Sequence, residues 1–232
     1  MVRLVRRALG AVLGMGLLAA GCAPADPRDP QPASETPAPR QAPRPRIVML
    51  GDSLTAGYGL ERRQAYPALI QGRLDAEGYD YEVVNAGLSG DTSAGGRRRL
   101  EWVLEGPVAI LVVALGGNDG LRGLPVEQLR DNLEHIVTSA RRRGIRVLLA
   151  GMEAPANLGA NYTAAFREAF QNVAREHDVA FLPFLLDGVV GRVELNQADA
   201  IHPNARGAAR LAANLWPLLE PLLAGPSPGE AP

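Results

Sequence analysis

A serine, a histidine and an aspartate in this sequence have the types and spacing that acyl-transfer chemistry requires. Gly51-Asp52-Ser53 follows an apolar run, and Asp199 stands three residues before His202. A serine hydroxyl becomes a nucleophile when a neighbouring base takes its proton, and histidine suits this task because its ordinary pKa is about 6.5. A carboxylate then orients the imidazole and stabilises its charged form. We therefore predict Ser53 as the nucleophile, His202 as the general base and Asp199 as the carboxylate that orients His202.

Groups that can stabilise a developing oxyanion occur in two further stretches. Ser89-Gly90-Asp91 contains a glycine whose backbone can approach a substrate closely, and Gly116-Gly117-Asn118 supplies a side-chain amide. A donor aimed at an oxyanion contributes on the order of 10²–10³ in rate. The predicted oxyanion hole consists of the backbone N–H groups of Ser53 and Gly90 and the side-chain amide of Asn118.

Each of these residues also has an ordinary structural interpretation. Ser53 could cap a helix, Asn118 could occupy a turn, and His202 could begin the last helix. Asp199 and His202 could bind a metal only with a further ligand. The other two histidines, His135 and His177, are expected to lie exposed on helix surfaces, away from the site. No metal is predicted.

The elements that must bring these stretches together can be predicted from the hydrophobic pattern. Strands buried on both faces are expected at Ile47–Leu50, Tyr81–Asn85, Val108–Leu115, Arg146–Ala150 and Val179–Leu182. Helices are expected at Pro67–Gly78, Pro125–Arg143, Tyr162–Glu176 and Pro203–Leu223. Alternating strands and helices indicate a mostly parallel sheet, whose ligands lie beyond the carboxyl ends of the strands. All four stretches are therefore expected at one edge of the sheet.

Several other side chains are predicted to have structural roles. Asp52 is expected to be structural and to bond backbone amides near the turn, and Asp91 and Asp119 are expected to brace loops. The runs Arg97–Arg99 and Arg141–Arg143 are expected to be solvated helix faces. A further prediction concerns core packing, which is expected for Leu100, Trp102, Val103 and Leu104.

The four stretches, in this order, resemble the motifs of the SGNH hydrolase (GDSL esterase) family. The matching segments are "GDSL", "SGDTS", "GGNDG" and "DAIHPN", and the resemblance covers Ile47 to Leu223. Thr55 stands where a G-x-S-x-G motif has its second glycine, which disfavours an α/β-hydrolase nucleophile elbow. Longer segments such as "VVNAGLSGDTSAGG" are similar to the bacterial group of acyl-CoA thioesterase I, protease I, lysophospholipase and arylesterase.

This resemblance implies a flavodoxin-like three-layer αβα sandwich with a five-stranded parallel sheet. It implies a Ser53–His202–Asp199 triad, the oxyanion hole named above, an acyl groove lined by the loop from Asp119 to Leu124, and no cofactor. The implied substrates are carboxylic esters, such as aryl esters and lysophospholipids, and acyl thioesters. Two alternatives stay open: a deacetylase or acyltransferase acting on cell-envelope glycans, and a non-catalytic lipoprotein that binds lipids or glycans.

The N-terminal segment has the features of a bacterial export signal. Arginines precede a short apolar run that ends in Leu18-Ala19-Ala20-Gly21-Cys22, which resembles a lipobox, with Ala19 where leucine is commonest. We predict a lipoprotein signal peptide at 1–22, a proline-rich tether at 23–45, the hydrolase domain at 46–224 and a disordered tail at 225–232. Lipidation of Cys22 would hold the domain at a membrane, facing the periplasm or the exterior, and outer-membrane sorting is compatible with Ala23. The alternative is a soluble secreted or periplasmic protein.

Composition narrows the possible partners. The formal net charge is −1, which argues against a nucleic-acid partner, and the 47% hydrophobic content is that of a globular protein with a buried core. Cys22 is the only cysteine, so no intramolecular disulfide can form.

Overall fold

The computed structural model describes residues 43–224. The predicted signal peptide with Cys22, most of the predicted tether and the predicted tail at 225–232 lie outside the described residues. No helix within residues 43–224 combines the length and the apolar composition that a membrane-spanning helix needs.

Five strands within the described residues form one parallel sheet in the order β2-β1-β3-β4-β5. They are β1 (Arg46–Gly51), β2 (Glu82–Gly87), β3 (Val108–Ala114), β4 (Arg146–Ala150) and β5 (Ala180–Leu182). Each strand lies within two residues of its predicted bounds. Gly51 pairs with Gly87 on one side and with Ala114 on the other. The carboxyl ends of β1, β2 and β3 are therefore level, and the segments that follow them start side by side.

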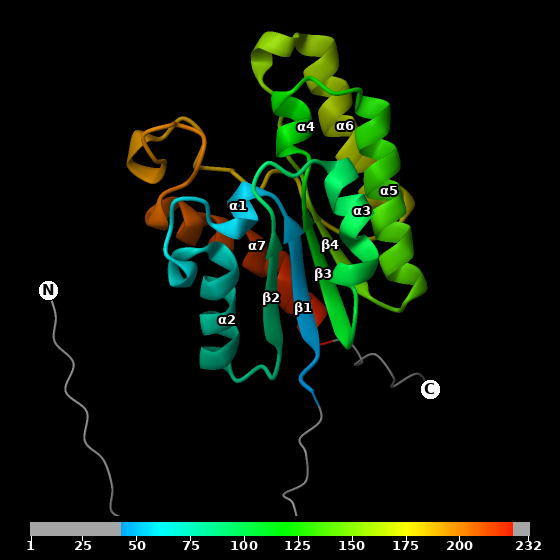
Figure 1. The fold of residues 1–232 in the computed structure, drawn as a ribbon, viewed down its shortest axis with the longest axis vertical. Helices are drawn as coiled ribbons and strands as arrows, with labels where there is room; N and C mark the ends of the chain where they lie inside the picture. The colour runs from blue at the N-terminus through cyan, green and yellow to red at the C-terminus, as the bar shows by residue number, and fades with distance from the viewer. Residues whose placement is uncertain (1–42, 225–232) are drawn as a thin grey trace, which may run out of the picture. The chain divides into compact units, whose positions relative to one another are not determined.

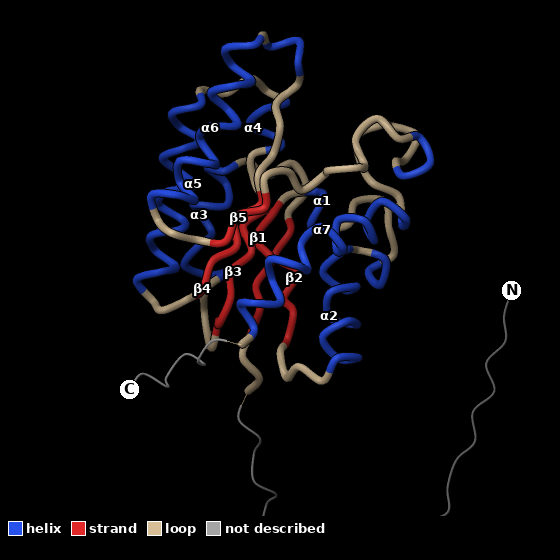
Figure 2. Tube along the Cα trace, turned by 180° about the vertical axis from the view of Figure 1, so that it is seen from behind, coloured by secondary structure: helices blue, strands red, loops and turns tan. Residues whose placement is uncertain are grey.

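Helices cover both faces of the sheet and produce the predicted three-layer sandwich. Figure 2 shows α2 and α7 on one side and α3, α5 and α6 on the other, and the same layers can be followed in Figure 1. The helices are α1 (Ser53–Ala56), α2 (Tyr66–Glu77), α3 (Ser93–Val103), α4 (Gly117–Leu121), α5 (Val126–Arg142), α6 (Ala160–Glu176) and α7 (Ala205–Leu223). Short 3₁₀ turns are present at Arg62–Gln64, Ala156–Leu158 and Val193–Leu195.

Burial follows the position of each strand in the sheet. All seven residues of β3 are buried, and β1 and β4 are buried except at their first residue. The edge strands β2 and β5 are only partly covered, so the expectation that they are buried on both faces is wrong. An edge strand has a neighbour on one side only, and polar residues such as Glu82 occupy its open positions.

Two predictions about side-chain packing need correction. Leu100, Val103 and Leu104 are buried as predicted, but 69% of Trp102 is exposed. Successive residues on a helix point about 100° apart, so Trp102 turns away from the face that its neighbours bury. His135 is exposed as predicted, whereas only 17% of the His177 side chain is exposed.

Candidate active site

Ser53 stands at the first position of α1, directly beyond the carboxyl end of β1. The chain can turn there because Gly51 has no side chain: a Cβ atom on Gly51 would lie 1.9 Å from Thr55 Oγ1. Asp52 caps α1, since its Oδ1 accepts a hydrogen bond from Leu54 N at 3.0 Å. The turn therefore fixes the direction in which the Ser53 hydroxyl leaves the backbone.

His202 and Asp199 are held together by the short connection that precedes α7. Asp199 Oδ1 accepts from the backbone N–H groups of Ile201 and His202, both at 3.0 Å, and Oδ2 lies 2.7 Å from His202 Nδ1. Ala200 has a φ of 59°, which completes this tight turn. The hydrogen bond from the His202 backbone is the main cause that lowers the pKa of Asp199, to about 2.

The protonation of Asp199 determines which hydrogen-bond roles the imidazole can take. At neutral pH Asp199 is ionised and can only accept, so Nδ1 of His202 must be the donor. In the neutral imidazole, Nε2 then carries a lone pair. His202 Nε2 lies 3.0 Å from Ser53 Oγ and can accept the proton of that hydroxyl. The structure thus brings together the three predicted residues in one hydrogen-bonded chain.

Two further residues support His202, and sequence reasoning missed both. The ring of Tyr58 lies against the imidazole, with centroids 4.6 Å apart. Gln197 donates from Nε2 to the carbonyl oxygens of Tyr58 at 2.7 Å and Pro203 at 3.0 Å. These contacts connect the segment after α1 to the segment that carries the histidine.

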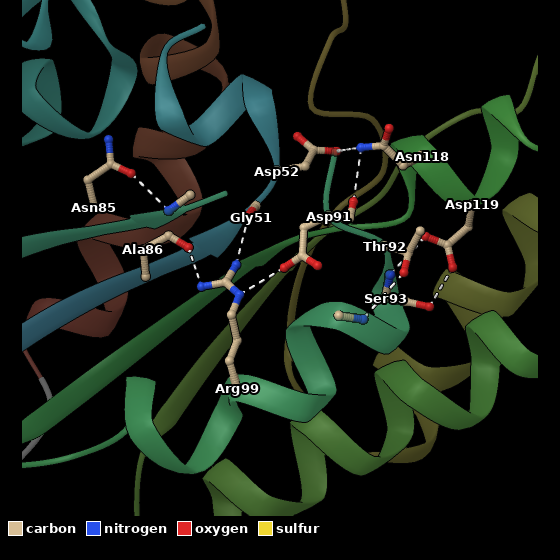
Figure 3. Close-up of polar contacts among 12 residues, drawn as sticks. Gly51, Asp52, Asn85, Ala86, Asp91, Thr92, Ser93, Arg99, Asn118 and Asp119 are labelled. Carbon is tan, nitrogen blue, oxygen red and sulfur yellow. Dashed lines mark hydrogen bonds and ion pairs between the residues drawn. The ribbon is translucent and has the colours of Figure 1, made fainter. Parts of the chain in front are cut away.

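Asn118 and Gly90 lie beside Ser53 on the same cleft. Asn118 Nδ2 donates to the backbone carbonyl of Asp91 at 2.9 Å and makes a longer contact of 3.3 Å with Asp52 Oδ2 (Figure 3). Gly90 has a φ of 81°, a conformation that favours glycine. The two predicted donors that follow β2 and β3 therefore line the same cleft as the predicted nucleophile.

Asp52 is not part of the chain from Ser53 to Asp199. Its carboxyl group points toward Asn118 (Figure 3) and is only 2% exposed. Burial raises the pKa of Asp52 to about 6, partly offset by the hydrogen bond from Leu54 and by attraction to His202. The prediction that Asp52 is structural and bonds backbone amides near the turn is confirmed.

Asp119 and Asp91 brace loops as predicted. Asp119 accepts from Ser93 N at 2.8 Å and from Ser93 Oγ at 2.5 Å, and Asn132 Nδ2 donates to the same hydroxyl at 3.0 Å. This buried network joins the starts of α3 and α4 to α5, so it holds Asn118, the neighbour of Asp119. Asp91 instead forms an ion pair with Arg99.

Arg99 contradicts the prediction that Arg97–Arg99 is a solvated face. Arg97 and Arg98 are exposed, but the Arg99 side chain is only 16% exposed and points to the ends of β1 and β2 (Figure 3). Helix geometry could have shown that not all three arginines are solvated, because three consecutive residues cover more than half a turn and cannot share one face.

A cleft of about 710 Å³ opens at this edge of the sheet and contains Ser53 and His202 in its wall. Most of its other lining side chains are apolar: Leu54, Leu121, Met152, Ala154, Pro155, Ala156, Phe184, Leu186, Val190 and Ile201. Leu121 comes from the predicted groove loop, Asp119 to Leu124. Within residues 43–224, no group of three or more His, Cys, Asp or Glu residues is arranged to hold a metal ion.

A flavodoxin-like sheet with a serine, a histidine and an aspartate in contact at its carboxyl edge is the arrangement of a serine hydrolase. Residues 49–210 match the model of the GDSL-like Lipase/Acylhydrolase family. The chain belongs to this family and is an enzyme of the SGNH esterase type.

Curated relatives and a solved structure agree with this assignment. Esterase TesA of Pseudomonas aeruginosa is 47% identical over 79% of this chain and 92% of its own. Thioesterase 1/protease 1/lysophospholipase L1 of Escherichia coli K12 is 36% identical over 79% of this chain and 88% of its own. The psychrotrophic esterase EstA from Pseudoalteromonas sp., in a crystal structure inhibited by monoethylphosphonate, superimposes with a TM-score of 0.73, is 31% identical, and matches 78% of this chain and 99% of its own.

Proposed function

We propose that Ser53, His202 and Asp199 form the catalytic triad of an esterase that works through an acyl-enzyme. The observation that carries the proposal is the chain of contacts from Ser53 Oγ to His202 Nε2 at 3.0 Å and from His202 Nδ1 to Asp199 Oδ2 at 2.7 Å, at the wall of an apolar cleft. This is the geometry that an activated serine nucleophile needs.

The reaction would take place in two halves. Ser53 Oγ attacks the carbonyl carbon of the ester while His202 Nε2 takes its proton. The tetrahedral intermediate then expels the alcohol or thiol, which receives that proton, and leaves the acyl group on Ser53. Water attacks the acyl-enzyme in the same way, with His202 again as base, and releases the carboxylic acid.

The oxyanion of each intermediate would be bound by Ser53 N–H, Gly90 N–H and the Asn118 side chain. Asn118 Nδ2 has a good hydrogen bond to Asp91 O at 2.9 Å and a long one to Asp52 at 3.3 Å. The long contact lies beyond the usual N–H···O range, so the N–H that makes it is only weakly engaged and can be donated to an oxyanion instead. Loss of one such donor lowers kcat on the order of 10²–10³-fold.

The proposed substrates are carboxylic esters with an apolar acyl part, including aryl esters and lysophospholipids, and acyl thioesters. The apolar lining of the 710 Å³ cleft supports an acyl chain as the recognised group. The names of the relatives, an esterase and a thioesterase with lysophospholipase activity, support the same range.

A panel of p-nitrophenyl esters of increasing chain length, with an acyl-CoA and a lysophospholipid beside it, tests this proposal. We expect hydrolysis of the esters by the wild type and its loss in Ser53→Ala. Ser89→Ala is the matched control, because Ser89 also lines the cleft but lies in the loop after β2. Equal activity of Ser53→Ala and the wild type would contradict the assignment.

We also propose that the mature enzyme is a lipoprotein anchored through Cys22, a residue outside the described part of the chain. The support is the short apolar run with small residues before a lone cysteine. Detergent-phase partitioning of the protein expressed in bacteria tests this. The wild type should enter the detergent phase and Cys22→Ser should stay in the aqueous phase; a wild type in the aqueous phase would contradict the anchor.

A further inference from the structure

Arg99, on α3, forms hydrogen bonds to three separate groups at the carboxyl edge of the sheet (Figure 3). Its Nε donates to Asp91 Oδ2 at 2.8 Å, Nη1 to the Ala86 carbonyl at 2.7 Å and Nη2 to the Gly51 carbonyl at 2.9 Å. The Arg99 and Asp91 side chains are only 16% and 7% exposed. The pair is therefore a largely buried one with several hydrogen bonds.

The three acceptors belong to the segments that carry the proposed oxyanion hole. Gly51 is two residues before Ser53 at the end of β1, and Ala86 lies at the end of β2. Asp91 directly follows Gly90, and its backbone carbonyl accepts from Asn118 Nδ2 at 2.9 Å. One guanidinium group thus connects the three backbone segments that supply Ser53 N–H, Gly90 N–H and the anchor of Asn118.

The chemistry of the site suits arginine. A planar guanidinium can donate to two carbonyls and a carboxylate at once, and the Gly51 carbonyl accepts from Arg99 in addition to the backbone N–H of Leu88 at 3.0 Å. A lysine would supply a single compact charge. Gly95 makes room for the pair, because a Cβ atom there would lie 1.5 Å from Asp91 Oδ1.

We propose that Arg99 and Asp91 are positioning residues that fix the oxyanion hole relative to Ser53, an inference that rests on the proposed function. Neither side chain is part of the cleft wall, so neither contacts substrate. Their loss should reduce stabilisation of the transition state more than binding of the ground-state ester.

Steady-state kinetics with a p-nitrophenyl ester separate this role from a purely structural one. Arg99→Ala, Arg99→Lys and Asp91→Asn are compared below the unfolding temperature of every variant. We expect kcat to fall on the order of 10²-fold, the size of effect that a misplacement of about 1 Å produces, with KM within about threefold of wild type. Arg98→Ala is the matched control: Arg98 is the exposed neighbour on the same helix, and both constants should stay at wild-type values.

Chemical rescue gives a second measurement. Millimolar guanidinium should restore part of the kcat of Arg99→Ala while leaving wild type and Arg98→Ala unchanged, because the ion can occupy the vacated site. If Arg99→Ala does not fold, Arg99→Lys and Asp91→Asn supply the kinetic test.

The outcomes distinguish the two proposals. The positioning role alone would be overturned if the Arg99 and Asp91 variants fold and keep an unchanged kcat. In that case the wild type still hydrolyses the ester and Ser53→Ala is inactive. A fall in melting temperature with no fall in kcat would also overturn it. A wild type without esterase activity, or a fully active Ser53→Ala, would overturn the proposed function and this inference with it.

Discussion

The Asp52→Asn variant should become more stable relative to wild type as pH rises. The Asp52 carboxyl is 2% exposed, and burial raises its pKa from 3.8 to about 6. Asparagine has nearly the same shape and no ionisation, and its carbonyl oxygen can still accept from Leu54 N, as Asp52 Oδ1 does now at 3.0 Å.

The size of the effect follows from the pKa difference. Between pH 3.8 and about 6 the folded protein holds a proton on Asp52 that the unfolded chain has already lost. Stability contributed by this group is therefore present below pH 3.8 and is lost as pH rises through about 6. A shift of about two pKa units, at about 1.4 kcal/mol each, gives about 3 kcal/mol at neutral pH.

Urea unfolding of both proteins from pH 4 to pH 8 measures this quantity. The free energy of unfolding of Asp52→Asn minus that of wild type should increase by about 2 kcal/mol between pH 4 and pH 7, because the remainder of the effect falls below pH 4, and should stay constant above pH 7. Titrating groups that do not interact with Asp52 cancel in the difference. Asp131→Asn is the control for the loss of one carboxylate, because Asp131 is exposed on α5.

Activity should move in the opposite direction. The carboxylate of Asp52 is attracted to a protonated His202 and contacts the amide of Asn118, so kcat should fall in Asp52→Asn even as stability rises. A stability difference that is flat across pH 4–8, or that decreases with pH, would refute the reasoning from burial.

Two further predictions concern the site and its support. Asp199→Asn should lower kcat by up to about 10⁴-fold, because an amide at that position no longer fixes the tautomer of His202. Initial rates with a p-nitrophenyl ester measure this effect, and near-wild-type rates would contradict it. Gly95→Ala should lower the free energy of unfolding by about 1–3 kcal/mol, since its Cβ would lie 1.5 Å from Asp91 Oδ1. Gly72→Ala, in a helix with nothing within 4 Å of the new Cβ, should raise it by about 0.5–1 kcal/mol. Urea unfolding measures both substitutions. The same change in the free energy of unfolding for both would contradict the destabilising role given to the contact between the new Cβ at position 95 and Asp91.

Much of the site was predictable because its residues follow strand ends. Parallel strands present their carboxyl ends at one edge, so Ser53, Gly90 and Asn118 had to lie near one another once β1, β2 and β3 were recognised. The contact between Asp199 and His202 is local and follows from their spacing. The meeting of Ser53 with His202 was predicted by the family resemblance, since no local pattern specifies a contact over 149 positions.

The rest depends on tertiary contacts that the hydrophobic pattern does not contain. Helix α3 includes two glycines, which disfavour a helix on propensity alone. Its bounds were not predicted, although Arg97–Arg99 was expected on a helix face and Thr92 caps the helix by accepting from Gly95 N. Without knowledge of which face of α3 packs on the sheet, the burial of Arg99 and the exposure of Trp102 could not be assigned. The half-burial of β2 and β5 likewise depends on the strand order.

Labelling with a fluorophosphonate and locating the adduct by mass spectrometry tests the central claim most directly. We expect one adduct per chain, on Ser53, which also forms in Ser89→Ala and is absent in Ser53→Ala. An adduct on another residue, or labelling that survives in Ser53→Ala, would contradict it.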